Sequence, residues 1–117
     1  MIKRLVHVGL TVADLETMLH FYTSVLGLAV TFETPHPQGG SVFYLNGTGG
    51  ESIELIHFTT PKPHDGRDMH RTGLHHFGLL VEDVRKETER LKSLGVEFDG
   101  SAFWDPEGNR IHLIQLR

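Results

Sequence analysis

The chain has 117 residues, about the size of one domain. Its composition, 38% hydrophobic and 22% charged, is typical of a globular protein. A net charge of −4 provides no basic surface for nucleic acid or anionic lipid. No apolar run is long enough for a secretory signal or a membrane span, so we expect a cytoplasmic location. Because the sequence contains no cysteine, disulfides and thiolate metal sites are excluded.

An internal repeat organises the sequence. Residues 7–14 read HVGLTVAD, and residues 76–83 read HFGLLVED. Each segment has the pattern of a strand and ends in an aspartate, a residue that commonly caps the start of a helix. A helical pattern follows in both copies and stops at a glycine, Gly27 in the first and Gly95 in the second.

Three short strand-like runs follow each predicted helix. These runs are residues 28–32, 41–45 and 52–58 in the first copy, and 96–98, 101–104 and 110–116 in the second. The sequence therefore predicts an α+β fold in which a βαβββ module occurs twice. We expect one domain over residues 1–117, with a first module of about 1–58, a connector of 59–73 and a second module of about 74–117.

The repeat brings metal-binding residue types to equivalent positions. His7 corresponds to His76, and Glu54 corresponds to His112. If the two modules pack about an approximate two-fold axis, strand alternation directs all four side chains into a shared cavity and their apolar neighbours toward the helices. A divalent cation would offset the cost of burying these polar groups. The alternative is a buried Glu–His hydrogen-bond network without metal.

Three other histidines are expected to be ordinary surface or packing residues. His57 follows Glu54 by an odd number of positions and should lie on the opposite face of its strand. His75 precedes His76 and should point away from it for the same reason. His20 lies in the first predicted helix among polar neighbours.

Taken together, these motifs resemble the vicinal-oxygen-chelate superfamily, which includes glyoxalase I, extradiol dioxygenases, methylmalonyl-CoA epimerase, and fosfomycin- and bleomycin-resistance proteins. The resemblance covers essentially the whole chain and rests on His7, Val12–Asp14, Phe21–Tyr22, Leu26–Gly27, Ile53–Leu55, His76–Asp83 and Asp105–Asn109. It implies two βαβββ modules that form a barrel-like cleft around one divalent metal ion. It also implies that the ligands are His7, Glu54, His76 and His112, with coordination positions left open for two neighbouring substrate oxygens.

The chain departs from the glyoxalase I pattern at two places. The resemblance implies a glutamate in the last strand, where this chain has His112, so Glu54 is the one carboxylate left to act as a catalytic base. The second module is also shorter than the first, which predicts a low cavity wall on that side. We therefore expect a homodimer, in which a second chain covers the open side.

Three functions fit the sequence. The first is a metal-dependent lyase or isomerase of the glyoxalase or epimerase type that acts on a small oxygenated substrate, with Ni, Zn, Co, Fe(II) or Mn as the metal. The second is an Fe(II) dioxygenase of the extradiol type, since His7, His76 and Glu54 form a set of two histidines and one carboxylate. The third is a non-enzymatic protein that sequesters a drug, as bleomycin-resistance proteins do, and the four-ligand pattern argues against it.

Overall fold

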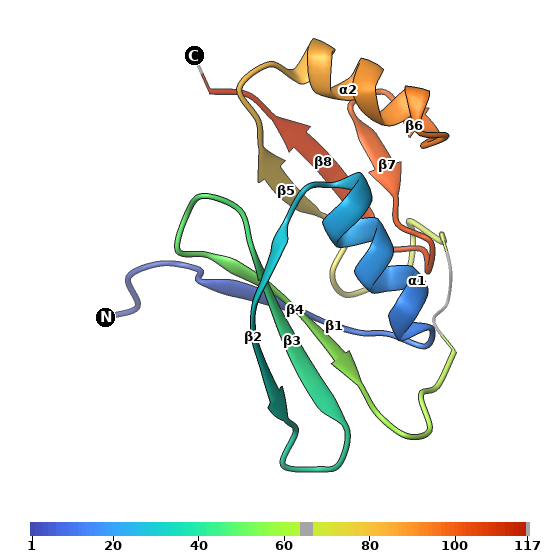
Figure 1. The fold of residues 1–117 in the computed structure, drawn as a ribbon. Coiled ribbons are helices and arrows are strands. Elements are labelled where there is room, and N and C mark those ends of the chain that lie inside the picture. The colour runs from blue at the N-terminus through green and yellow to red at the C-terminus, as the bar shows by residue number, and fades with distance from the viewer. Residues whose placement is uncertain (64–66, 117) are drawn as a thin grey trace. The chain divides into compact units, whose positions relative to one another are not determined.

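The computed structural model describes residues 1–63 and 67–116. It divides into two compact units, Met1–Pro63 and His64–Arg117, and in each unit one helical region accompanies one four-stranded sheet (Figure 1). The predicted α+β class is confirmed. Among the described residues no helix is long and apolar enough to span a membrane.

The first unit has the predicted order of one strand, one helical region and three strands. Its elements are β1 His7–Thr11, α1 Leu15–His20, η1 Phe21–Val25, β2 Ala29–Pro35, β3 Ser41–Asn46 and β4 Ser52–His57. The sheet order is β1-β4-β3-β2. Strand β1 runs parallel to β4, whereas the other neighbours are antiparallel.

The second unit repeats this topology. Its elements are β5 Phe77–Leu80, α2 Val84–Ser93, β6 Phe98–Asp99, β7 Ala102–Trp104 and β8 Arg110–Ile114. The sheet order is β5-β8-β7-β6, again with the first and last strands parallel. Strands β6 and β7 have two and three residues, against seven and six in β2 and β3, so the predicted shortening of the second unit is confirmed.

The helices begin and end where the sequence indicates. Asp14 accepts a hydrogen bond from the Thr17 amide at 3.0 Å, and Asp83 accepts one from the Lys86 amide at 3.1 Å. Past the helices, Gly27 has a φ of 88° and Gly95 a φ of 91°, a left-handed conformation that glycine adopts without strain.

One part of the first helical region differs from the regular α-helix that was expected. Residues Phe21–Val25 form a π-helical turn, in which the Leu26 amide donates to the carbonyl of Phe21, five positions back. The Thr23 hydroxyl donates to the Leu19 carbonyl at 2.6 Å and so competes for the acceptor that an α-helix would give to the Thr23 amide.

Most of the core lies on one face of each sheet, and Val42 and Ala102 are buried on the opposite faces. In β1 and the residue after it, Leu10 and Val12 are buried, whereas His7, Gly9 and Thr11 are exposed. Burial of each such aliphatic side chain contributes roughly 2 kcal/mol.

The second sheet uses the same alternation in β8. Ile111 and Leu113 are buried, and the residues between and beside them lie on the opposite face of the strand. In both units one sheet face carries most of the packing, and the opposite face carries Glu54 in the first unit and His112 in the second.

Candidate metal centre

His7 and Glu54 form the first of two histidine-containing pairs. The parallel register of β1 and β4 places Gly9 beside Glu54, so His7 is two residues away along β1 on the same face. The Nδ1 atom of His7 lies 3.1 Å from Oε2 of Glu54. The side chain of Glu54 is 11% exposed and that of His7 is 54% exposed, so the pair is reached from solvent through the imidazole.

His76 and His112 form the second pair, in the other unit. The register of β5 and β8 places Gly78 beside His112, so His76 is again two residues before the position that faces its partner. The two imidazole rings stack, with centroids 4.0 Å apart and planes 20° from parallel. The offset is the same in both units, which confirms that the four residues occupy equivalent positions in the repeat.

His112 is held in the neutral form. Its pKa is lowered first by burial and then by the positive charge of His76, Arg110 and His75, while Asp99 acts in the opposite direction. Because a metal ion binds the neutral imidazole, this shift keeps His112 available as a ligand at neutral pH.

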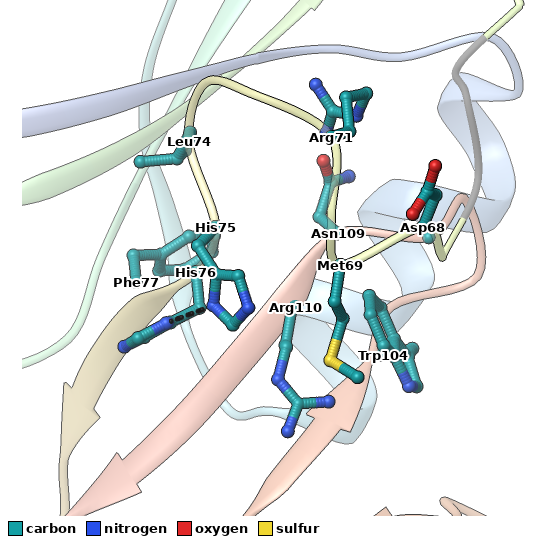
Figure 2. A pocket seen from close by; sticks show the side chains of 11 residues that line it. Asp68, Met69, Arg71, Leu74, His75, His76, Phe77, Trp104, Asn109 and Arg110 are labelled. Atoms are coloured by element: carbon teal, nitrogen blue, oxygen red, sulfur yellow. Dashed lines mark hydrogen bonds between the residues drawn. The ribbon is translucent and has the colours of Figure 1, made fainter.

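The prediction that His75 points away from His76 is wrong. Their Nδ1 atoms lie 2.8 Å apart and form a hydrogen bond (Figure 2). Strand alternation does not apply here, because both residues precede Phe77, the first residue of β5. His57 does follow the prediction, since it lies three positions from Glu54 within β4 and therefore on its other face.

An arginine that the sequence analysis did not single out lies beside the second pair. Arg110 is two residues before His112 in β8 and so shares its face. Its guanidinium carbon lies 5.0 Å from the centroid of the Trp104 ring, and its Nη2 lies 3.3 Å from Oδ2 of Asp99. The signal in the sequence was the alternation of Arg110 with His112 in the last strand.

A tight turn fixes the start of β8 and therefore the place of Arg110. The fully buried carboxylate of Asp105 accepts hydrogen bonds from the amides of Glu107 and Asn109, both at 2.9 Å. It also accepts one from the side-chain amide of Asn109 at 2.7 Å. The turn of Asp105–Asn109 thus has a structural role next to the candidate site.

A small pocket adjoins the second pair. Its volume is about 30 Å³, and its polar lining includes His75, His76, Arg71, Asn109 and Arg110 (Figure 2). In neither unit do the described residues bring together three side chains arranged as a metal site. Each unit therefore provides two of the four predicted ligands.

An aromatic surface shares the sheet face that carries the first pair. Tyr44 pairs with Glu54 across β3 and β4, and Phe32 pairs with Tyr44 across β2 and β3. The two rings lie 5.6 Å apart between centroids, and the Phe32 side chain is exposed. This surface gives the first unit an apolar contact area next to the pair of His7 and Glu54.

The model of the Glyoxalase/Bleomycin resistance protein/Dioxygenase superfamily matches residues 4–113. The chain therefore belongs to this superfamily, and the resemblance inferred from its motifs is confirmed.

Two named relatives and one solved structure align with most or all of this chain. Lactoylglutathione lyase of Neisseria meningitidis is 28% identical over 130 residues, covering 97% of this chain and 91% of that protein. An ethylmalonyl-CoA/methylmalonyl-CoA epimerase of Cereibacter sphaeroides is 33% identical over 104 residues, with coverages of 86% and 78%. The crystal structure of a glyoxylase/bleomycin resistance protein/dioxygenase domain from Frankia sp. EAN1pec matches with a TM-score of 0.81 and 26% identity over the full length of both chains.

Proposed function

We propose that this protein is a divalent-metal-dependent enzyme of the glyoxalase type. It binds a small oxygenated substrate through two neighbouring oxygens and isomerises it or cleaves a bond, as a lyase or an epimerase does. In this proposal His7 and Glu54 of the first unit, with His76 and His112 of the second, are the ligands of one metal ion.

The observation that carries this proposal is the equivalence of the two pairs. Each pair has the same register offset, and Glu54 and His112 each lie on the sheet face opposite the main core residues of their strands. Three imidazoles and a carboxylate fit Ni, Co, Zn, Fe(II) or Mn. The hydrogen bond between His75 and His76 engages Nδ1 of His76, so Nε2 of His76 is the nitrogen that would coordinate.

Glu54 is the proposed catalytic base. A bound metal ion would act as a Lewis acid toward the substrate oxygens. Glu54 then accepts the proton that leaves the carbon next to them, and the nearby Nδ1 of His7 can stabilise either form of the carboxyl group through a hydrogen bond. With His112 in the last strand, the second unit contributes no carboxylate to this task.

Metal content followed by parallel activity assays tests the proposal. Elemental analysis of the purified protein should find about one first-row metal ion per chain. Turnover of methylglyoxal with a thiol, or epimerisation of methylmalonyl-CoA, then supports the glyoxalase type. Protein that holds no metal and takes none up on titration would contradict it.

The second candidate is an Fe(II)-dependent ring-cleaving dioxygenase, and a specific feature of the ligand set favours it. His7, His76 and Glu54 provide the two histidines and one carboxylate that such iron sites use. The iron-loaded protein should then consume oxygen with catechols and show no turnover of methylglyoxal or methylmalonyl-CoA. That combination would support the dioxygenase function over the glyoxalase type.

A further inference from the structure

We propose that Arg110 binds a carboxylate group of the substrate in the pocket of the second unit. The binding of a carboxylate there depends only on the second unit. That this carboxylate belongs to the substrate rests on the proposed function, because the pocket lies beside His76 and His112, two of the proposed metal ligands.

The guanidinium of Arg110 is buried without enough acceptors. The side chain is 9% exposed, and among the described residues neither Nε nor Nη1 has a hydrogen-bond partner. The carboxylate of Asp99 contacts only Nη2, at 3.3 Å, and the Asp99 side chain is 68% exposed. Leaving charged donors buried and unpaired is costly, so a ligand that supplies acceptors would remove a penalty that the folded chain otherwise bears.

The neighbours of Arg110 hold it in place without satisfying its donors. The Trp104 ring lies 5.0 Å from the guanidinium carbon, a cation–π contact that leaves the N–H groups at the edges of the guanidinium plane. Arg67 also lies over this ring, at 5.5 Å, and adds a second positive charge to the region.

The pocket next to Arg110 favours a small anion. Its lining includes Arg71, His75, His76 and Asn109 as well as Arg110, and Asp68 is its one acidic residue among those that the structure describes. A volume of about 30 Å³ admits a group of a few atoms such as a carboxylate, since one water needs roughly 10–15 Å³. The chain as a whole carries a net charge of −4, so the attraction for anions is local to this pocket.

The position of Arg110 defines the class of substrate. Two residues of a strand span about 7 Å, so Arg110 and His112 lie about that far apart along β8. A substrate that reaches both carries its acid group a few bonds from the oxygens that would coordinate the metal. This describes a small oxo- or hydroxy-carboxylic acid or its conjugate.

Trp104 provides a direct probe, because it is the one tryptophan of the chain and lines the pocket. Malonate is titrated into the wild-type protein while sodium chloride holds the ionic strength constant. The tryptophan fluorescence should change with malonate concentration and reach a plateau. Inorganic phosphate is the comparison anion. The inference is overturned if malonate acts no differently from chloride, or if phosphate binds more tightly than malonate.

Two substitutions locate the binding. Arg110→Met should weaken malonate binding by at least about tenfold, because it removes charge-assisted hydrogen bonds. Arg110→Lys should also weaken it, since an ammonium group lacks the guanidinium geometry. The matched control is Arg85→Met, which removes the same charge from a side chain of α2 that is 90% exposed. Unchanged binding in both Arg110 variants, or an equal loss in the Arg85 variant, would overturn the assignment.

Stability and metal content separate this inference from a structural role and from the proposed function. Arg110→Met removes a buried, poorly paired cation, so its Tm should not fall below that of the wild type. If Arg110→Met does not fold, Arg110→Lys still tests the inference. Malonate binding by a chain that takes up no metal would contradict the proposed function alone, whereas full metal content without malonate binding would contradict the carboxylate site alone.

Discussion

The two units have the same topology but different chemistry. In the first, the strands β2 and β3 are long, and the pair of His7 and Glu54 is a contact between an imidazole and a carboxylate. In the second, β6 and β7 are short, and the pair of His76 and His112 is a ring stack without a carboxylate. The repeated backbone thus fixes where the donors lie, while single residues in the last strand of each unit decide what they can do.

The difference divides the proposed work between the units. Glu54 gives the first unit a group that can take a proton. The second unit gives the imidazole of His112, whose pKa is lowered first by burial and then by the positive charges around it, and Arg110 gives it an excess of hydrogen-bond donors. In the two proposals Glu54 takes the proton, and Arg110 binds the acid group of the substrate.

Removal of the Glu54 carboxylate should have the largest effect on activity. Glu54→Gln should lower kcat by about 10²–10⁴, the usual contribution of a general base. His57→Gln is the control, because His57 is in the same strand on the opposite face and should leave the rate unchanged. Steady-state kinetics with measured metal content reports both. Equal losses in the two variants would contradict the role of Glu54.

Removal of one histidine from each unit tests whether two chains share a site. The short second unit is the reason to expect a homodimer. Light scattering at micromolar concentration should therefore report about twice the mass of one chain. His7→Ala and His76→Ala should each lose most of their metal and activity. If ligands come from different chains, a mixture that exchanges subunits freely should regain roughly a quarter of the wild-type activity.

The same mixture can also give the opposite answer. If each site takes its ligands from one chain, the mixed dimer regains nothing. A stable, metallated and active monomer would contradict the predicted homodimer. His20→Ala, which removes an exposed histidine at the end of α1, is the control for effects of the substitution itself.

Large-to-small substitutions compare the cores of the two sheets. Leu55 of β4 and Leu113 of β8 are 0% and 4% exposed. Leu55→Ala and Leu113→Ala should each lower the free energy of unfolding by about 2–5 kcal/mol in urea titrations. Leu94→Ala, at a side chain that is 54% exposed, should change it by less than about 0.5 kcal/mol. A cost at Leu113 as small as that at Leu94 would show that the short second sheet does not depend on its core.

Local patterns made most of the fold predictable. The aspartate before each helix, the glycine after it and the alternation within strands each act over a few residues, so the sequence displays them directly. The repeat then predicted that His7 corresponds to His76 and Glu54 to His112. The register of Gly9 with Glu54 and of Gly78 with His112 shows the same correspondence.

The features that were not predicted depend on contacts between distant residues. The orientation of His75 follows from where β5 begins, and that start is set by the pairing of Phe77 with Ile111. The burial of Arg110 follows from its contact with Trp104, and alternation alone indicates its face but not its partners. Thr23 shows the same limit within a helix, because its hydroxyl competes with a backbone amide for one carbonyl.

The smallest expected effect compares the caps of the two helices. The Asp14 carboxylate accepts hydrogen bonds from both the amide and the hydroxyl of Thr17, whereas Asp83 accepts one from the amide of Lys86. Asp83→Ala should cost about 1 kcal/mol, and Asp14→Ala should lower the Tm by more than Asp83→Ala does.

The effect at Asp14 should also depend on pH. Its hydrogen bonds with Thr17 hold the pKa of Asp14 below its ordinary value of 3.8. The ionised carboxylate therefore stabilises the fold fully above pH 3.8, and this contribution is lost as the pH falls through the lowered pKa. Thermal unfolding at pH 7 and at about pH 3 should show a smaller difference between wild type and Asp14→Ala at the acidic pH. Asp14→Ser keeps an uncharged cap, so its Tm should exceed that of Asp14→Ala by an amount that does not vary with pH in this way. A constant gap between wild type and Asp14→Ala would contradict the charge-dependent cap.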